Sequence, residues 1–197
     1  MATINCGPVE DFKFGDKVEP RFEVALGGLP VAYSVLKPYR NINPDDKYKL
    51  SLKLNAEQFE EVKAAMLERL GELNVAGAFG ATAKQLDELL ARAVGESTKE
   101  DGVFRFYGSK RMGFKDKDEM LARRMLCVDG ETKEAIEGGV SLGAGSVVRS
   151  VFSVSLFKKD KQVLLKIEPT RVVVIKLVEP PKRESISHDG LADSYDY

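Results

Sequence analysis

The order of β-rich and helical segments constrains this 197-residue chain more than any other feature of its sequence. Two β-rich runs, RFEVALGG and LPVAYSVLK, are followed by a polar loop at residues 37–46 and then by the run KYKLSLKL. One helical segment comes next, and four or five further β-rich runs complete the chain. A parallel α/β sheet needs regular alternation of strands and helices, so this order predicts a mainly β fold instead.

The run KYKLSLKL, residues 47–54, alternates strictly between apolar and polar positions. Its apolar face consists of Tyr48, Leu50, Leu52 and Leu54, and its polar face consists of Lys47, Lys49, Ser51 and Lys53. A period of two residues predicts a strand with one buried and one exposed face.

Two helices are predicted after this strand. Asn55 caps the first helix, with Gln58 at the capping-box position. Its apolar stripe has helical spacing and consists of Phe59, Val62, Met66, Leu70 and Leu73. A link containing Gly71, Gly77 and Gly80 leads to a second helix at about residues 82–94. We expect both helices to pack against the core.

Strands interrupted by one helical segment fit a small closed or nearly closed barrel, and an OB-fold-like five-stranded barrel is the leading interpretation. The helical insertion covers about residues 56–95. The length favours one domain over residues 1–184, followed by a flexible acidic tail at residues 185–197. Barrels of this kind bind nucleic acid across exposed strand faces and their connecting loops.

The charge is unevenly distributed along the chain. The formal net charge is −1, but residues 185–197 contain three aspartates and no Lys or Arg. The remaining body has 30 basic and 28 acidic residues, a formal charge of +2. A local basic stripe matters more for polyanion binding than the overall charge, so nucleic acid stays a candidate partner.

Cations and aromatic rings share the outward faces of several predicted strands. In VFRFY, we expect Phe104 and Phe106 in the core, which leaves Arg105 and Tyr107 outward. The candidate DNA-binding residues are Lys47, Lys49, Arg105, Tyr107, Lys110, Arg111, Phe114, Lys115, Arg149, Phe157 and Lys158. Rings stack on bases of any sequence and cations bind the phosphates, so the pattern predicts sequence-tolerant binding of single-stranded DNA.

Other interpretations fit parts of this pattern. Lysines that alternate with leucines are also typical of an ordinary solvated strand face. The alternative function is a non-enzymatic β-barrel module that binds an acidic protein through its basic face. A third interpretation is a metal nuclease that uses Asp45 with Asp46, or Asp116 with Asp118, although neither pair has a third ligand in view.

Few residues suit catalysis or a cofactor. Cys6 and Cys127 lack zinc-site spacing, and His188 is the only histidine. The run GGVSLGAG lacks the Gly-Lys-Ser/Thr ending of a phosphate-binding loop. We therefore expect no enzymatic activity, no metal and no cofactor. The N-terminus lacks a signal-peptide pattern and no run approaches membrane-spanning length, which predicts a cytoplasmic protein.

The chain also resembles the single-stranded DNA-binding proteins of short-tailed bacteriophages that encode their own replication machinery. The segments EVALGGLPVAYSVLKPYR, DDKYKLSLKL and GGVSLGAGSVVRSVFSVSLFKK carry the resemblance, together with an Asp-rich end and an aromatic last residue. The resemblance implies an OB-fold that coats transient single strands during replication and recombination in the host cytoplasm. By position, Arg149 matches a cleft lysine, Phe157 matches a stacking tyrosine, and Lys47 falls near an arginine that touches DNA. Lys159 stands where the family can have a second stacking aromatic residue.

The terminal segment HDGLADSYDY, residues 188–197, has its own predicted role. The resemblance implies that Asp189, Asp193, Asp196 and Tyr197 contact the phage DNA polymerase and helicase-primase, and homodimers are common in that family. Polar termini are also common without any such function. Our hypothesis is that the tail lies in the basic groove in the absence of DNA and is displaced by the strand.

Overall fold

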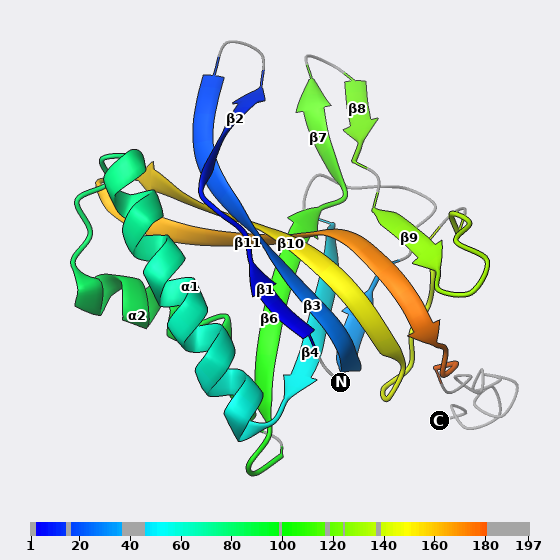
Figure 1. Ribbon diagram of the computed structural model, residues 1–197. Coiled ribbons are helices and arrows are strands. Elements are labelled where there is room, and N and C mark those ends of the chain that lie inside the picture. Colours follow the sequence, from blue (N-terminus) through cyan, green and yellow to red (C-terminus); the bar gives the residue numbers. More distant parts are fainter. Residues whose placement is uncertain are drawn as a thin grey trace, which may run out of the picture.

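The computed structural model describes residues 3–14, 17–36, 46–98, 100–116, 119–123, 125–136 and 139–180 (Figure 1). The helices are α1 (Ala56–Ala76) and α2 (Ala83–Ala91). The strands are β1 (Thr3–Cys6), β2 (Glu10–Phe14), β3 (Lys17–Val35), β4 (Lys47–Leu54), β5 (Val94–Glu96), β6 (Phe104–Arg111), β7 (Gly113–Asp116), β8 (Glu119–Ala122), β9 (Leu126–Asp129), β10 (Val147–Lys159) and β11 (Gln162–Lys176). The predicted mainly β fold with one helical segment is confirmed.

One large sheet organises the molecule. Strands β5, β6, β4, β3, β10, β11 and β9 are neighbours in that order, and β1 and β2 also pair with β3. The sheet curls without closing, and β11 packs against β6 although the two are not hydrogen-bonded neighbours. The fold is OB-fold-like, as predicted, but its sheet is open and has more strands than the predicted five, because β3 pairs with four other strands.

Strand β3 is a single strand of 19 residues where the sequence predicts two runs separated by Gly27 and Gly28. Gly28 has a φ of +71°, and the register against β10 shifts between Val148 and Arg149 opposite it. Gly28 is therefore the extra residue of a β-bulge, and glycine accepts this left-handed conformation without a steric penalty. The bulge bends the strand without ending it, so the pairing with β10 continues on both sides.

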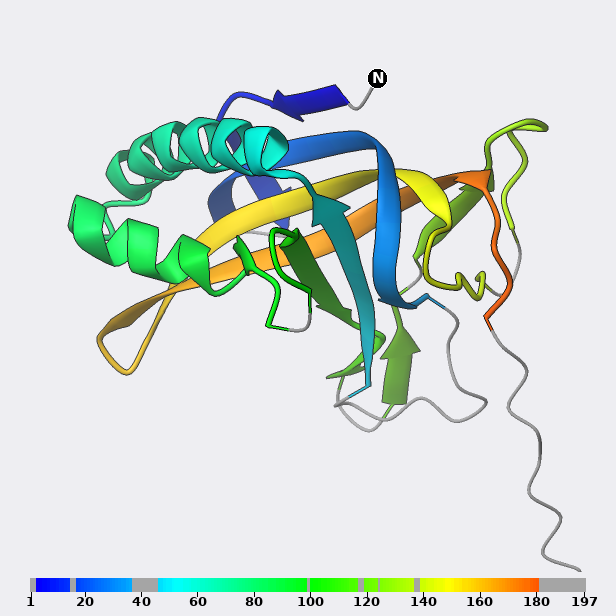
Figure 2. The same ribbon diagram turned by 90° about the horizontal axis from the view of Figure 1, so that it is seen from below.

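The two helices lie together at one side of the sheet (Figures 1 and 2). The predicted capping box at Asn55 is confirmed, because its side chain accepts from the Gln58 backbone N–H at 2.8 Å. Gly71 lies inside α1, so it is not part of the predicted link. Helix α2 ends at Ala91, earlier than predicted, because Val94 pairs with Phe106 as the first residue of β5.

The core lies between the curled sheet and α1. The rings of Phe106 and Phe152 pack with centroids 4.7 Å apart, and both side chains are fully buried. A Cβ added at Gly108 would lie 2.7 Å from the Phe152 ring, so only glycine allows β6 to approach β10 this closely. Phe104 stacks on Phe59 of α1, and both predicted core aromatics of β6 therefore point inward.

Candidate nucleic-acid interface

The outward face of β4 and β6 forms the floor of the candidate site. The two strands are antiparallel and place side chains in cross-strand pairs on this face, namely Lys47 with Arg111, Lys49 with Ser109, Ser51 with Tyr107, and Lys53 with Arg105. The alternate residues of β4 are buried in the core, as the period of two predicts, but Ser51 of the predicted exposed face is buried as well. Lys53 is engaged by Glu100, whose carboxylate oxygens accept from its ammonium at 2.7 and 2.8 Å.

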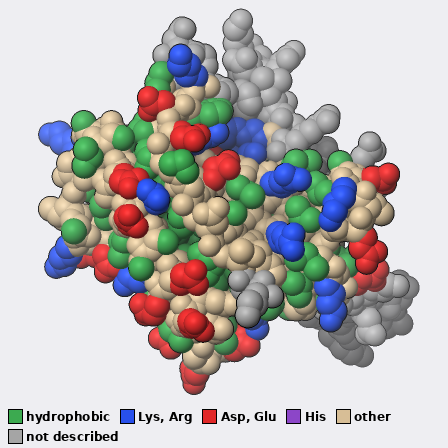
Figure 3. Space-filling model, viewed as in Figure 1, with side chains coloured by type: hydrophobic (Ala, Val, Ile, Leu, Met, Phe, Trp, Pro, Cys, Tyr) green, Lys and Arg blue, Asp and Glu red, His purple; other side chains and the backbone are tan. Residues whose placement is uncertain are grey.

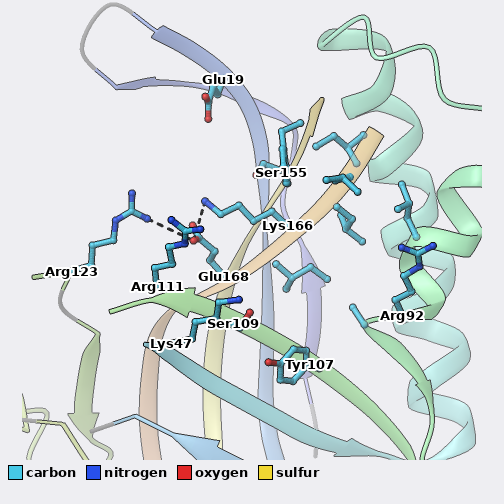
Figure 4. A pocket seen from close by; sticks show the side chains of 17 residues that line it. Glu19, Lys47, Arg92, Tyr107, Ser109, Arg111, Arg123, Ser155, Lys166 and Glu168 are labelled. Atoms are coloured by element: carbon cyan, nitrogen blue, oxygen red, sulfur yellow. Dashed lines mark ion pairs between the residues drawn. The ribbon is translucent and has the colours of Figure 1, made fainter. Parts of the chain in front are cut away.

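A hollow of about 680 Å³ extends from this floor across β10 and β11 to α2 (Figure 4). We call it the main groove. Five of its lining side chains are cations, namely Lys47, Arg92, Arg111, Arg123 and Lys166. Its carboxylates are Glu19 and Glu168, and its rings are Tyr107 and Phe157. The groove lining therefore combines a formal charge of +3 with exposed aromatic surface.

A second hollow of about 470 Å³ joins the main groove, because Arg92, Ala93 and Tyr107 line both. We call it the side pocket. Its other lining residues include Tyr33, Ser51, Glu96 and Arg105. The Arg105 Nε atom is buried and has no hydrogen-bond partner among the described residues. The two hollows are therefore neighbours, and cations line both of them.

Glu168 lies among the cations of the main groove (Figure 4). Its Oε1 atom is 3.0 Å from Lys166 Nζ and 3.8 Å from Arg123 Nη1. Burial lowers the pKa of the half-buried Lys110 ammonium, Glu168 opposes this effect, and Arg123 and Lys166 lower the pKa further. Two lining cations, Lys166 and Arg123, therefore surround one carboxylate, and Lys110 interacts electrostatically with all three groups.

Five of the eleven predicted DNA-binding residues line these two hollows. Lys47, Tyr107, Arg111 and Phe157 line the main groove, and Arg105 lines the side pocket. Lys49 lies on the same face beside Ser109, and Lys110 lies at the cluster around Glu168. The side chains of Phe114 and Lys115 lie outside the described part of the structure.

Two predicted residues lie away from both hollows. The exposed Arg149 packs over Gly27 of β3, close to Thr3. Arg149 lies eight positions before Phe157, which is about 26 Å along an extended strand. Arg171 of β11, which pairs with Val151 two residues from Arg149, is also exposed. Figure 3 shows a group of cations over this part of the molecule. The Lys158 ammonium donates to the Ala78 carbonyl at 3.4 Å, in the link between the helices.

The site also contains residues that the sequence-based prediction missed, namely Tyr33, Arg92, Lys166 and Glu168. Lys166 and Glu168 flank the buried Ile167, so their alternation on β11 was a usable signal. Arg92 was assigned to a predicted helix, but it follows the end of α2.

Within the described ranges, no helix is long and apolar enough to span a membrane. No three His, Cys, Asp or Glu side chains of that same part are grouped to hold a metal ion.

Solved structures provide the comparison for this fold and depression. The single-stranded DNA-binding protein of bacteriophage Enc34 superposes with a TM-score of 0.58 and 15% identity, covering 98% of this chain and 99% of that chain. The same phage protein in complex with single-stranded DNA gives a TM-score of 0.57 and 14% identity, covering 88% and 97%. Gp2.5, a single-stranded DNA-binding protein of bacteriophage T7, gives a TM-score of 0.49 and 17% identity, covering 90% of this chain and 88% of that chain. No protein-family model and no curated relative matches the sequence.

The Enc34 superpositions extend over most of both chains, and at these low sequence identities they show a shared fold. The chain therefore has the OB-fold-like fold of these bacteriophage single-stranded DNA-binding proteins. The resemblance predicted from the sequence is confirmed at this level.

Proposed function

We propose that this protein binds single-stranded DNA without strong sequence preference, with the strand lying along the main groove. The observation that carries the proposal is the combination of five cations with two exposed rings in the lining of one groove. Tyr107 is 37% exposed and Phe157 is 40% exposed, so both rings have free surface for a base. The shared fold with phage single-stranded DNA-binding proteins supports the same function.

The chemistry of the groove matches the two parts of a nucleotide. Arg and Lys side chains bind the phosphates and release condensed counterions, which makes the affinity depend on salt. The rings provide stacking surfaces, and every base has a π-face, so stacking tolerates any sequence. Lys47 and Arg111 lie together on the floor, and Arg92 lies near the α2 end of the groove (Figure 4).

The biological setting follows from the same proposal. A protein that coats transient single strands would act in replication and recombination of a phage genome in the host cytoplasm. Residues 185–197, with three aspartates and no Lys or Arg, would compete with DNA for the groove and, once displaced, recruit the phage DNA polymerase and helicase-primase. These roles require no enzymatic activity from the chain, and a homodimer is compatible with them.

The deciding experiment is a salt titration of binding to a fluorescently labelled oligothymidylate. We expect tight binding at low salt, with log K falling by about 0.7 per phosphate contact for each unit of log salt concentration. Arg111→Ala should reduce both the affinity and this slope. Arg69→Ala is the matched control, because Arg69 lies on α1 outside both hollows and pairs with Glu72 at 2.7 Å.

Each other outcome counts against the proposal. Absence of binding at low salt would overturn it and favour a module that binds an acidic protein. Magnesium-dependent loss of the oligonucleotide would point to a nuclease instead. Equal effects of Arg111→Ala and Arg69→Ala would remove the main groove as the binding path.

A further inference from the structure

The side pocket contains a row of three residues from three neighbouring strands. Tyr33 of β3 pairs with Ser51 of β4, and Ser51 pairs with Tyr107 of β6. All three therefore lie in one line across the sheet, with the smallest side chain in the middle. Ser51 is only 5% exposed, whereas Tyr33 is 49% and Tyr107 is 37% exposed. We call this row the tyrosine slot.

A register shift in β3 places Tyr33 in the slot. Val31 pairs with Leu52 and Tyr33 pairs with Ser51, so Ala32 is an extra residue on β3. In a regular strand Tyr33 would share the inward face of Val31, which is completely buried. One additional residue reverses the face on which a side chain lies, and such bulges are frequent next to binding sites. The half-exposed Tyr33 ring is the result.

The spacing of the row suits one planar ring between the two tyrosines. Neighbouring strands are about 4.8 Å apart, so Tyr33 and Tyr107 rise from backbones about 9.6 Å apart. Side chains of a sheet stand roughly perpendicular to it. Stacked aromatic rings have centroids from about 4.5 Å apart, so backbones at this separation leave the spacing for one ring between the two tyrosines.

The surroundings of the slot favour a ring that carries a phosphate. Arg92 lines both hollows beside Tyr107, and Arg105 lines the side pocket with a buried Nε that has no hydrogen-bond partner among the described residues. Glu96 is the carboxylate of this lining, so the two arginines outnumber it. The pocket volume of about 470 Å³ falls within the range of roughly 300 to 1,000 Å³ that is usual for small-molecule sites.

We infer that the tyrosine slot takes one nucleobase of the bound strand, sandwiched between Tyr33 and Tyr107 above Ser51. The inference rests on the proposed function and adds a discrete base-binding site to the main groove. The base leaves the groove beside Tyr107, and its neighbouring phosphates stay among the cations at Arg92 and Arg105. Phe157 stacks on a different base, because it lines only the main groove.

The test is a double-mutant cycle on oligonucleotide binding by the full-length protein. Tyr33→Ala and Tyr107→Ala should each weaken binding by about 5- to 150-fold, the range for loss of one stacked base. The double variant should bind nearly as well as the weaker single variant, because both rings hold the same base. Tyr33→Phe, which keeps the ring, should bind like the unmodified chain. All of these side chains are partly exposed, so the variants retain the core.

A spectroscopic measurement separates the slot from general groove binding. One 2-aminopurine placed in each position of an oligothymidylate in turn should be strongly quenched at one position in the complex, and Tyr33→Ala should remove that quenching. Losses from Tyr33→Ala and Tyr107→Ala that multiply would overturn the sandwich, as would unchanged binding and quenching in Tyr33→Ala. Phe157→Ala distinguishes the two proposals, because it should weaken binding even if the slot is wrong. If the unmodified chain binds no oligonucleotide, the proposed function itself fails.

Discussion

Substitution of Glu168 by glutamine should tighten DNA binding. The carboxylate lies 3.0 Å from Lys166 and 3.8 Å from Arg123, so a phosphate that approaches either cation competes with it. Glutamine has the same shape without the charge, and it raises the formal charge of the groove lining from +3 to +4. We therefore expect the substitution to make both cations more available to DNA.

The size of the effect follows from counterion release. Each additional phosphate contact on a single strand steepens the plot of log K against log salt concentration by about 0.7. Affinity rises when the salt concentration falls from about 0.5 M to about 0.05 M. One new contact makes this rise about 5-fold larger, and two new contacts make it about 25-fold larger. Glu168 is 17% exposed, but its partners Lys166 and Arg123 are 43% and 35% exposed. Ion pairs with such exposed partners contribute about 0 to 1 kcal/mol, so the folded state should change little.

Fluorescence anisotropy of a labelled oligothymidylate, titrated at several salt concentrations, measures both the affinity and the slope. Glu19→Gln is the matched control, since Glu19 lines the same groove but forms no ion pair with the described residues. We expect a smaller increase in affinity for this control. Weaker binding of Glu168→Gln, or a slope equal to that of the unmodified chain, would refute the reasoning and indicate that Glu168 holds Lys166 and Arg123 in position.

Four further outcomes are expected. Arg149→Ala should leave oligonucleotide binding unchanged, whereas Arg111→Ala should lower the salt slope by about 0.7. A lower slope for Arg149→Ala with an unchanged slope for Arg111→Ala would place the DNA strand on the outer face of β10 and β11. Phe106→Ala should lower the free energy of unfolding in urea by about 3 to 5 kcal/mol, because the ring is fully buried, and a loss below about 1 kcal/mol would contradict its core position. Asn55→Ala should lower the same quantity by about 1 kcal/mol through loss of the α1 cap, with Asn55→Asp as the nearly neutral control. Deletion of residues 188–197 should tighten binding at low salt, and an unchanged salt dependence would remove the tail as a competitor.

Local patterns in the sequence predicted much of the secondary structure. The alternation in residues 47–54 correctly separated the buried Leu50 from the outward Lys47, and Asn55 with Gln58 correctly marked the start of α1. The end of α2 was predicted too late, because pairing of Val94 with Phe106 overrides the local helical preference.

The candidate site was predicted less completely than the fold. Tyr107 and Phe157 were identified from alternation, because each lies on a strand with a clear buried face. Tyr33 was missed, since the extra residue Ala32 reverses its face and the sequence of the strand carries no clear mark of this bulge. Arg149 was predicted on the correct face of β10, but it lies beyond the end of the groove.

The sequence by itself determined much of the secondary structure and, along regular strands, which side chains face the core. These properties depend on a period of two or 3.6 residues, which is written in neighbouring positions of the chain. Only the tertiary structure decided that Arg92, Arg123 and Lys166 surround the same groove, and that Tyr33 and Tyr107 lie on either side of Ser51. The physical reason is that strand order and bulges depend on pairing between distant segments, which the local periodicity does not specify.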